Sequence, residues 1–117
     1  MDIENFRNYC LAKKGVTEEF PFDDKALVFK VMGKMFTITD VDSFASFNVK
    51  CDPELAIELR ERYSEVTPGY HMNKKHWNTI KMDGSIPDDL AQEWISHSYN
   101  LVVDKLPKLL KEEFNNL

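Results

Sequence analysis

The segment from Pro68 to Asn78 concentrates the side chains that could bind an anionic or planar ligand in this 117-residue sequence. Lysine ammonium groups bind phosphate, and tyrosine and tryptophan rings stack on a base or another planar group. The candidate residues of this segment are Tyr70, His71, Asn73, Lys74, Lys75, His76 and Trp77. The alternative is structural: Trp77 packs in the core, Tyr70 covers the end of a sheet, and Asn73 satisfies loop backbone groups.

The charge of this part of the chain differs from that of the whole. Fifteen Lys and Arg against 20 Asp and Glu give a net charge of −5, which as a global field disfavours nucleic acid and anionic membranes. Residues 67–82, however, contain Lys74, Lys75 and Lys81 and no acid. The simpler interpretation is a solvated loop, because short runs of charge usually do no more than that.

The spacing of nucleophiles and metal ligands predicts neither catalysis nor a metal site. Cys10 and Cys51 stand 41 positions apart and fall on apolar stripes, so we expect buried, reduced thiols. The sequence has no Gly-x-Ser-x-Gly elbow and no glycine-rich phosphate loop. His71 and His76 are five positions apart and His97 is the remaining histidine, a spacing that does not supply three or four convergent metal ligands without distant carboxylates. We therefore expect no cofactor and no catalytic residue, although His71 or His76 could act as an acid or base near neutral pH.

Apolar periodicity and capping signals place these residues on an α+β scaffold. Helical spacing predicts a first helix over residues 2–14, and alternation predicts strands over 26–32, 35–39 and 45–51. We expect Gly33-Lys34 to form a two-residue hairpin turn and residues 16–24 to form a loop.

The second half of the chain continues with helix and strand signals. Asp52-Pro53 predicts the start of a helix over 53–63, residues 77–82 predict a strand, and Pro87 begins a last long helix, with a polar tail after Pro107. The expected fold is a single domain over residues 1–117. It is an antiparallel sheet covered on one face by helices, in the order α-β-β-β-α-β-α.

Three separated motifs resemble the MmcQ/YjbR family of small bacterial proteins. They are VFKVMGKMF at 28–36, VKCDPE at 49–54 and PGYHMNKKHW at 68–77, and residues 98–99 and 105–107 are also in the family style. The resemblance spans nearly the whole chain and implies a CyaY-like fold and the family's usual label of DNA binding through hairpins that act as double wings. Its characteristic polar positions here are Lys30, Lys34 and Lys50 on the sheet and Tyr70, His71, Asn73, Lys74, His76 and Trp77 after it.

Two functional hypotheses follow. The first is a non-enzymatic bacterial protein that binds DNA weakly, with phosphate contacts from Lys34, Lys74, Lys75 and Lys81 and base contacts from Tyr70 or Trp77. The alternative is a small anionic ligand or peptide-binding module with a pocket lined by Lys30, Lys50, Tyr70, His71, Asn73 and His76. No apolar run spans a bilayer and residues 1–4 carry no leader, so we expect a cytoplasmic protein without a membrane partner.

Overall fold

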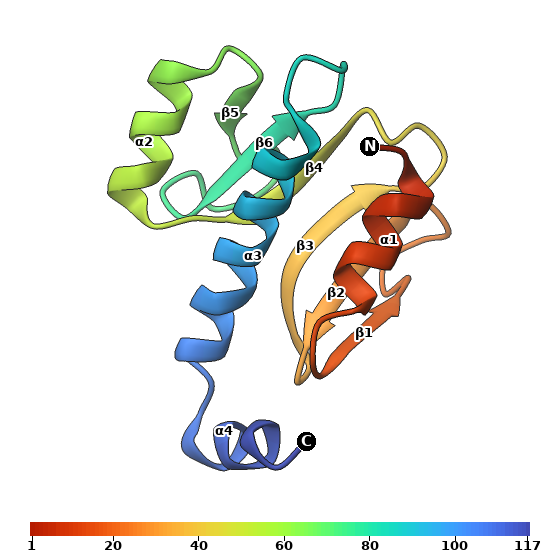
Figure 1. Cartoon of the computed structure of the whole chain (residues 1–117), viewed down its shortest axis with the longest axis vertical. Coiled ribbons are helices and arrows are strands. Elements are labelled where there is room, and N and C mark those ends of the chain that lie inside the picture. Colours follow the sequence, from red (N-terminus) through yellow and green to blue (C-terminus); the bar gives the residue numbers. More distant parts are fainter.

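A six-stranded antiparallel sheet forms the centre of the protein, which is described here over residues 1–117 by a computed structural model. The strands lie in the order β1-β2-β3-β4-β6-β5. The helices are α1 (Ile3–Leu11), α2 (Pro53–Arg62), α3 (Asp88–Asp104) and α4 (Lys108–Asn115). The strands are β1 (Val16–Glu19), β2 (Ala26–Val31), β3 (Lys34–Asp40), β4 (Ser46–Lys50), β5 (Val66–Pro68) and β6 (Trp77–Lys81). Figure 1 shows their arrangement.

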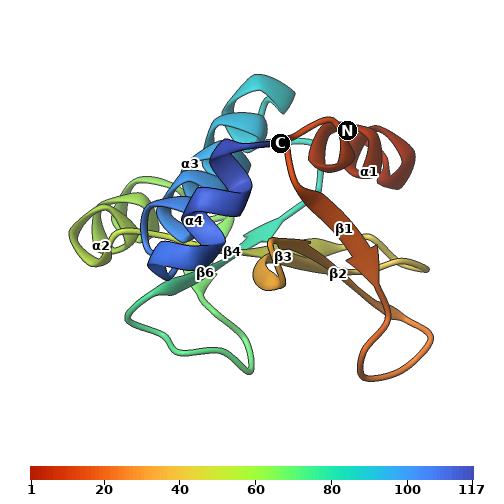
Figure 2. The same cartoon turned by 90° about the horizontal axis from the view of Figure 1, so that it is seen from below.

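Helices cover only one face of the sheet. In Figure 2 α1 and α3 lie on one side, and the β1–β2 and β5–β6 loops project from the other. The cross-strand pairs Val28–Ile38 and Asn48–Thr79 lie on this second face, which we call the open face. The predicted α+β class, with an antiparallel sheet covered on one face, is therefore confirmed.

The core lies between the sheet and α1 and α3. Phe6 of α1 is fully buried, and its ring centroid lies 5.1–5.6 Å from those of Phe29, Phe44 and Phe47. Such tilted and edge-to-face aromatic pairs add to the hydrophobic stabilisation of the buried area. Cys10 and Cys51 are buried and reduced, as their positions predicted.

Ser98 of α3 joins two strands by its hydroxyl group. Its Oγ donates to the carbonyl of Phe36 at 2.6 Å and accepts from the backbone N–H of Lys50 at 2.8 Å. Phe36 is fully buried, so its carbonyl needs a partner within the protein. This contact fixes β3 and β4 against α3 and places Lys50 at the end of β4.

The predicted element order lacks two edge strands and the last helix. The segment expected to be a loop contains β1, whose Val16 pairs with Val31 and whose Glu18 forms an ion pair with Arg7 of α1. β5 was not predicted either. Both strands are only three or four residues long, and pairing with a neighbour rather than their own pattern determines short strands.

Two local predictions are also corrected. The tail after Pro107 is the helix α4, which places the ring of Phe114 6.4 Å from that of Tyr99. The β2–β3 turn consists of Met32 and Gly33, with φ of 51° and 81°, because Val31 pairs with Lys34. Positive φ at both central residues is the type I′ geometry that matches the twist of the strands. None of the four helices has both the length and the apolar character to cross a membrane.

Candidate ligand-binding site

The β5–β6 loop (residues 69–76) carries most of the predicted binding residues and is held by Arg60 of α2. The Nε of Arg60 donates to the side-chain oxygen of Asn78 at 2.7 Å. Its guanidinium also donates to the carbonyl of Lys74, and to that of Trp77 at 3.2 Å. Three acceptors from the loop and β6 thus converge on one side chain, a charge-assisted arrangement that is stronger than neutral hydrogen bonds.

The start of the loop lies directly against β6. The N–H of Gly69 donates to the carbonyl of Trp77 at 2.8 Å, and a Cβ on Gly69 would lie only 2.7 Å from the Cβ of Trp77. The next residue is fixed on the open face, because the N–H of Tyr70 donates to the Oγ1 of Thr79 at 2.9 Å and its carbonyl accepts from Asn48 at 3.4 Å. The base of the loop therefore has one defined position.

The structure divides the predicted residues of the loop between two hollows. Tyr70 and His71, together with Met72, line a groove on the open face. Asn73, His76 and Trp77 line a smaller pocket at the end of the sheet where β4 ends and β6 begins. The predicted single pocket that includes Tyr70, His71, Asn73 and His76 is thus two separate hollows on opposite parts of the loop.

The smaller hollow is rich in cations and hydrogen-bond donors. It has a volume of about 280 Å³ and is lined by Lys50, Asn73, His76, Trp77 and Lys105, which together we call the basic pocket. Lys50 and Trp77 are neighbours across β4 and β6, and His76 is held by its carbonyl, which accepts from the N–H of Cys51 at 2.8 Å. No carboxylate lines the basic pocket. Two ammonium groups, an imidazole and an indole can together hold an anionic group beside a planar one.

The remaining predicted lysines do not gather at this pocket. Lys30 forms an ion pair with Glu19, and the Nζ of Lys74 donates to the carbonyl of Gly69 at 3.3 Å. Lys34 lies beside the β2–β3 turn, and Lys75 is exposed on the loop; neither lines either hollow. The lysines named from the sequence are therefore distributed over the turn, the loop and the sheet.

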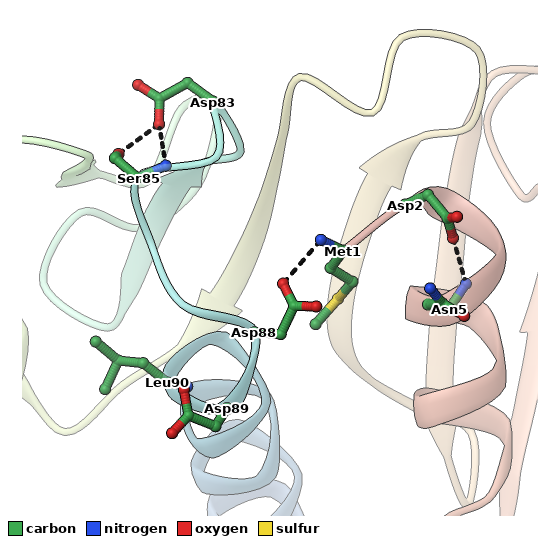
Figure 3. Close-up of polar contacts among 8 residues, drawn as sticks. All are labelled: Met1, Asp2, Asn5, Asp83, Ser85, Asp88, Asp89 and Leu90. Atoms are coloured by element: carbon green, nitrogen blue, oxygen red, sulfur yellow. Dashed lines mark hydrogen bonds and ion pairs between the residues drawn. The ribbon is translucent and has the colours of Figure 1, made fainter.

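Lys81 lies at the opposite end of β6 from the basic pocket, close to acidic residues. Its Nζ is 4.0 Å from the carboxylate of Asp83. Hydrogen bonds from Ser85 lower the pKa of Asp83, which therefore stays ionised. Figure 3 shows Asp83 together with Asp88, whose carboxylate binds the Met1 ammonium group at 2.8 Å. The carboxylate of Asp83 has the same sign as a phosphate group, so it disfavours phosphate binding at Lys81.

Lys105 and Arg60 are the residues of this candidate site that the reasoning from the sequence did not select. Lys105 follows the last residue of α3, and it enters the basic pocket only because α3 crosses the sheet above β4. Its motif at 105–107 is the one signal that could have indicated it. For Arg60 the sequence offers no comparable signal, because its partners are two backbone carbonyls and a buried side chain far along the chain.

The remaining candidate groups are metal ligands and the two cysteine thiols. No group of three or more His, Cys, Asp or Glu side chains is arranged to hold a metal ion. Burial raises the pKa of the Cys10 thiol to about 12 and that of Cys51 to about 11, so neither is a reactive thiolate at neutral pH.

Comparison with known proteins gives consistent relatives. The chain is 37% identical over 109 residues to the uncharacterized protein YjbR of Escherichia coli strain K12, and the match covers 92% of each chain. It is 29% identical over 75 residues to the uncharacterized protein YyaQ of Bacillus subtilis strain 168, covering 64% of this chain and 63% of that relative. These relatives carry no assigned activity.

Solved structures share the fold. The crystal structure of Deinococcus radiodurans protein DR2400, with the domain DUF419, has a TM-score of 0.90 and 37% identity over 97% of this chain and 88% of that one. A Pseudomonas syringae protein has a TM-score of 0.73 at 23% identity, covering 86% of this chain and 98% of that one, which shows the fold alone. A YjbR family model matches residues 11–101, in agreement with the three motifs. The chain therefore belongs to the YjbR family.

Proposed function

We propose that this protein is a non-catalytic binding module that holds a small phosphorylated ligand with a planar group, such as a mononucleotide, in the basic pocket. The observation that carries the proposal is the lining of that pocket: two lysines, a histidine, an asparagine and a tryptophan, with no acid, in a chain of net charge −5. A positive cluster in a protein of negative net charge favours the binding of an anion at this point of the surface.

The chemistry of the lining fits a phosphate beside a ring. Lys50 and Lys105 approach from β4 and from the end of α3, so that an anion between them meets ammonium groups from two elements. Trp77 supplies a large aromatic face on which a planar group can stack. The volume of about 280 Å³ is at the lower limit of the roughly 300–1,000 Å³ typical of small-ligand sites, which suits a phosphate with its attached ring partly outside.

The positions of the charged side chains favour this small ligand over a DNA duplex bound between the β1–β2 and β5–β6 loops. A duplex held there would bring phosphates to the groove on the open face, which is lined by Asp23 and Asp40. Lys30 is neutralised by Glu19, and Lys81 lies beside Asp83. The cations that remain favourable for phosphate are therefore those of the basic pocket and the adjacent loop.

Calorimetric titration with adenosine monophosphate, adenosine and inorganic phosphate tests the proposal. We expect the monophosphate to bind most tightly, because only it offers both the anion and the ring. Lys50→Met and Lys105→Met keep the apolar stem and remove the ammonium group, so each should weaken binding at least about tenfold, as the loss of a charge-assisted hydrogen bond requires. Lys34→Met and Lys75→Met, which change lysines outside the basic pocket, are the matched controls and should leave the affinity unchanged.

Single-stranded and duplex oligonucleotides, titrated at two salt concentrations, form the second arm. Salt-dependent DNA binding that is lost in a Lys74→Met/Lys75→Met variant, without binding of the monophosphate, would overturn the proposal in favour of DNA recognition by the loop. Equal losses in the control variants would overturn it as well, as would absence of binding to all three small probes.

A further inference from the structure

The second hollow lies on the open face and is separate from the basic pocket. It is a groove of about 510 Å³ whose floor comes from β2, β3 and β4. Its two walls are the β1–β2 loop (residues 20–25) and the β5–β6 loop, which project from the same face on opposite sides of the sheet (Figure 2). This volume is within the range of roughly 300–1,000 Å³ found for small-ligand sites.

Both walls present an exposed aromatic ring to the groove. Phe22 on the β1–β2 loop is 73% exposed and Tyr70 on the β5–β6 loop is 68% exposed. Exposed aromatic side chains at the edges of a hollow are typical of binding sites, since they offer a large contact area with little loss of conformational freedom. The two rings come from loops far apart in the sequence, so the tertiary structure alone places them on one groove.

The floor and one wall are also suited to an apolar body. Met35 and Ile38 of β3 and Met72 of the loop line the groove, and methionine side chains adapt to the shape of a partner. His71 beside them has φ of 58°, in the left-handed region that histidine occupies more often than most residues with a Cβ.

The charges of the groove determine the sign of the ligand. Asp23 and Asp40 line it, against Lys25 and His71. Each lining carboxylate accepts two backbone N–H groups at its Oδ1, at 2.7–3.0 Å. These hydrogen bonds lower the pKa of Asp23 and Asp40, so both carboxylates are ionised at neutral pH.

We propose that this groove is a second, independent binding site, which takes a small aromatic compound carrying a cationic group. The aromatic body lies on Ile38 and Met35 between Phe22 and Tyr70, and the cation lies at the carboxylates of Asp23 and Asp40. An ammonium group is attracted both by a carboxylate and by the face of an aromatic ring. The site shares no lining residue with the basic pocket.

Three probes with the same phenyl body and different charge test the sign. They are phenethylamine, 2-phenylethanol and 3-phenylpropionate, titrated separately while the backbone amide signals are followed by NMR. We expect the amine to bind most tightly and to shift the amides of the two walls and of β3, and the carboxylate to bind least. Equal affinity for the three probes, tighter binding of the carboxylate, or shifts outside the groove would overturn the proposal.

Matched variants test the residues. Phe22→Ala should weaken amine binding several-fold, and Phe20→Ala should not, because Phe20 is 48% exposed on the same loop but does not line the groove. Asp40→Asn keeps the oxygen that accepts the two backbone N–H groups and removes the charge, so it should weaken the amine at least several-fold and leave 2-phenylethanol unchanged. Asp24→Asn is its control. Losses as large in Phe20→Ala or Asp24→Asn would overturn the assignment.

Failure at this site and failure at the basic pocket are distinguishable. The Lys50→Met and Lys105→Met variants alter the basic pocket and should bind phenethylamine as the parent does. Loss of amine binding in either of them would overturn the independence of the two sites.

Discussion

The guanidinium Nε of Arg60 lies 2.7 Å from the side-chain oxygen of Asn78, a residue that is only 1% exposed. Asn78 in turn directs its Nδ2 to the carbonyl of Ala56 at 3.5 Å. Helix α2 is thereby joined to β6 by a buried polar contact, and the same guanidinium holds the carbonyl of Lys74 in the β5–β6 loop. The position of both hollows therefore depends on a residue that lines neither.

Replacing Arg60 with methionine should loosen the loop. It leaves the buried oxygen of Asn78 without a partner, which should reduce the free energy of unfolding by about 1–3 kcal/mol. Urea denaturation gives the free energy of unfolding, and amide hydrogen exchange over residues 69–76 should accelerate. Arg62→Met is the control: Arg62 is exposed, 5.5 Å from the ring centroid of Tyr63, and its loss should change stability by less than about 0.5 kcal/mol. Equal effects in the two variants would contradict the role of Arg60.

A methyl group at residue 69 should displace the loop. Gly69 lies so close to β6 that the new Cβ would be 2.7 Å from the Cβ of Trp77 and 3.0 Å from its carbonyl oxygen. Gly69→Ala should therefore destabilise the protein by about 1–3 kcal/mol and shift amide signals of residues at both hollows. In Gly33→Ala nothing lies within 4 Å of the new Cβ, so its strain comes from φ alone and the shifts should stay near the turn. Unchanged signals at Trp77 in Gly69→Ala would disprove the close approach.

Removing the hydroxyl of Ser98 should release β4 from α3. Ser98→Ala leaves the carbonyl of Phe36 and the N–H of Lys50 without their partner, and we expect a loss of about 1–3 kcal/mol in unfolding free energy. Hydrogen exchange of the Lys50 amide should accelerate more than that of its neighbours. Asn100→Ala, at an exposed position of the same helix, should leave that amide unaffected. Slow exchange at Lys50 in the Ser98 variant would show that another group accepts its hydrogen bond.

The two thiols should be unreactive in the folded protein. With pKa values of about 12 for Cys10 and about 11 for Cys51, almost no thiolate is present at mildly alkaline pH, and both side chains are buried. An aromatic disulfide reagent should label both cysteines of the unfolded chain quickly and neither of the folded chain. Rapid labelling of either thiol without unfolding would contradict its burial.

The same shifts determine how stability depends on alkaline pH. Both folded pKa values are raised above the ordinary value of about 9, so above that pH the folded state retains protons that the unfolded state loses. This contribution to stability is complete below about pH 9 and is lost as the pH rises through the folded values of about 11 and about 12. Urea denaturation across this range should show a smaller alkaline decrease in a Cys10→Ser/Cys51→Ser variant than in the parent.

The sequence by itself determined the elements that carry strong local signals. Asp52 accepts the backbone N–H of Leu55 at 3.2 Å at the start of α2, as the Asp52-Pro53 signal predicted, and Asp2 accepts that of Asn5 at 2.8 Å at the start of α1. The alternation in β2 and β4 gave the face of each strand, and the apolar stripe of the last long helix gave its place over the sheet. These features need only neighbouring residues, because caps and periodicity are local properties of the chain.

Only the tertiary structure decided which polar residues share a site. The sequence pointed to the segment 68–78 as the candidate binding passage, but the loop directs Tyr70 and His71 to one hollow and Asn73, His76 and Trp77 to another. The order of the strands and the crossing of α3 brought Lys105 beside Lys50 and left Lys81 beside Asp83. Phe22 and Tyr70 face one groove for the same reason. Contacts of this kind depend on strand register and helix packing across the whole chain, which local periodicity does not specify.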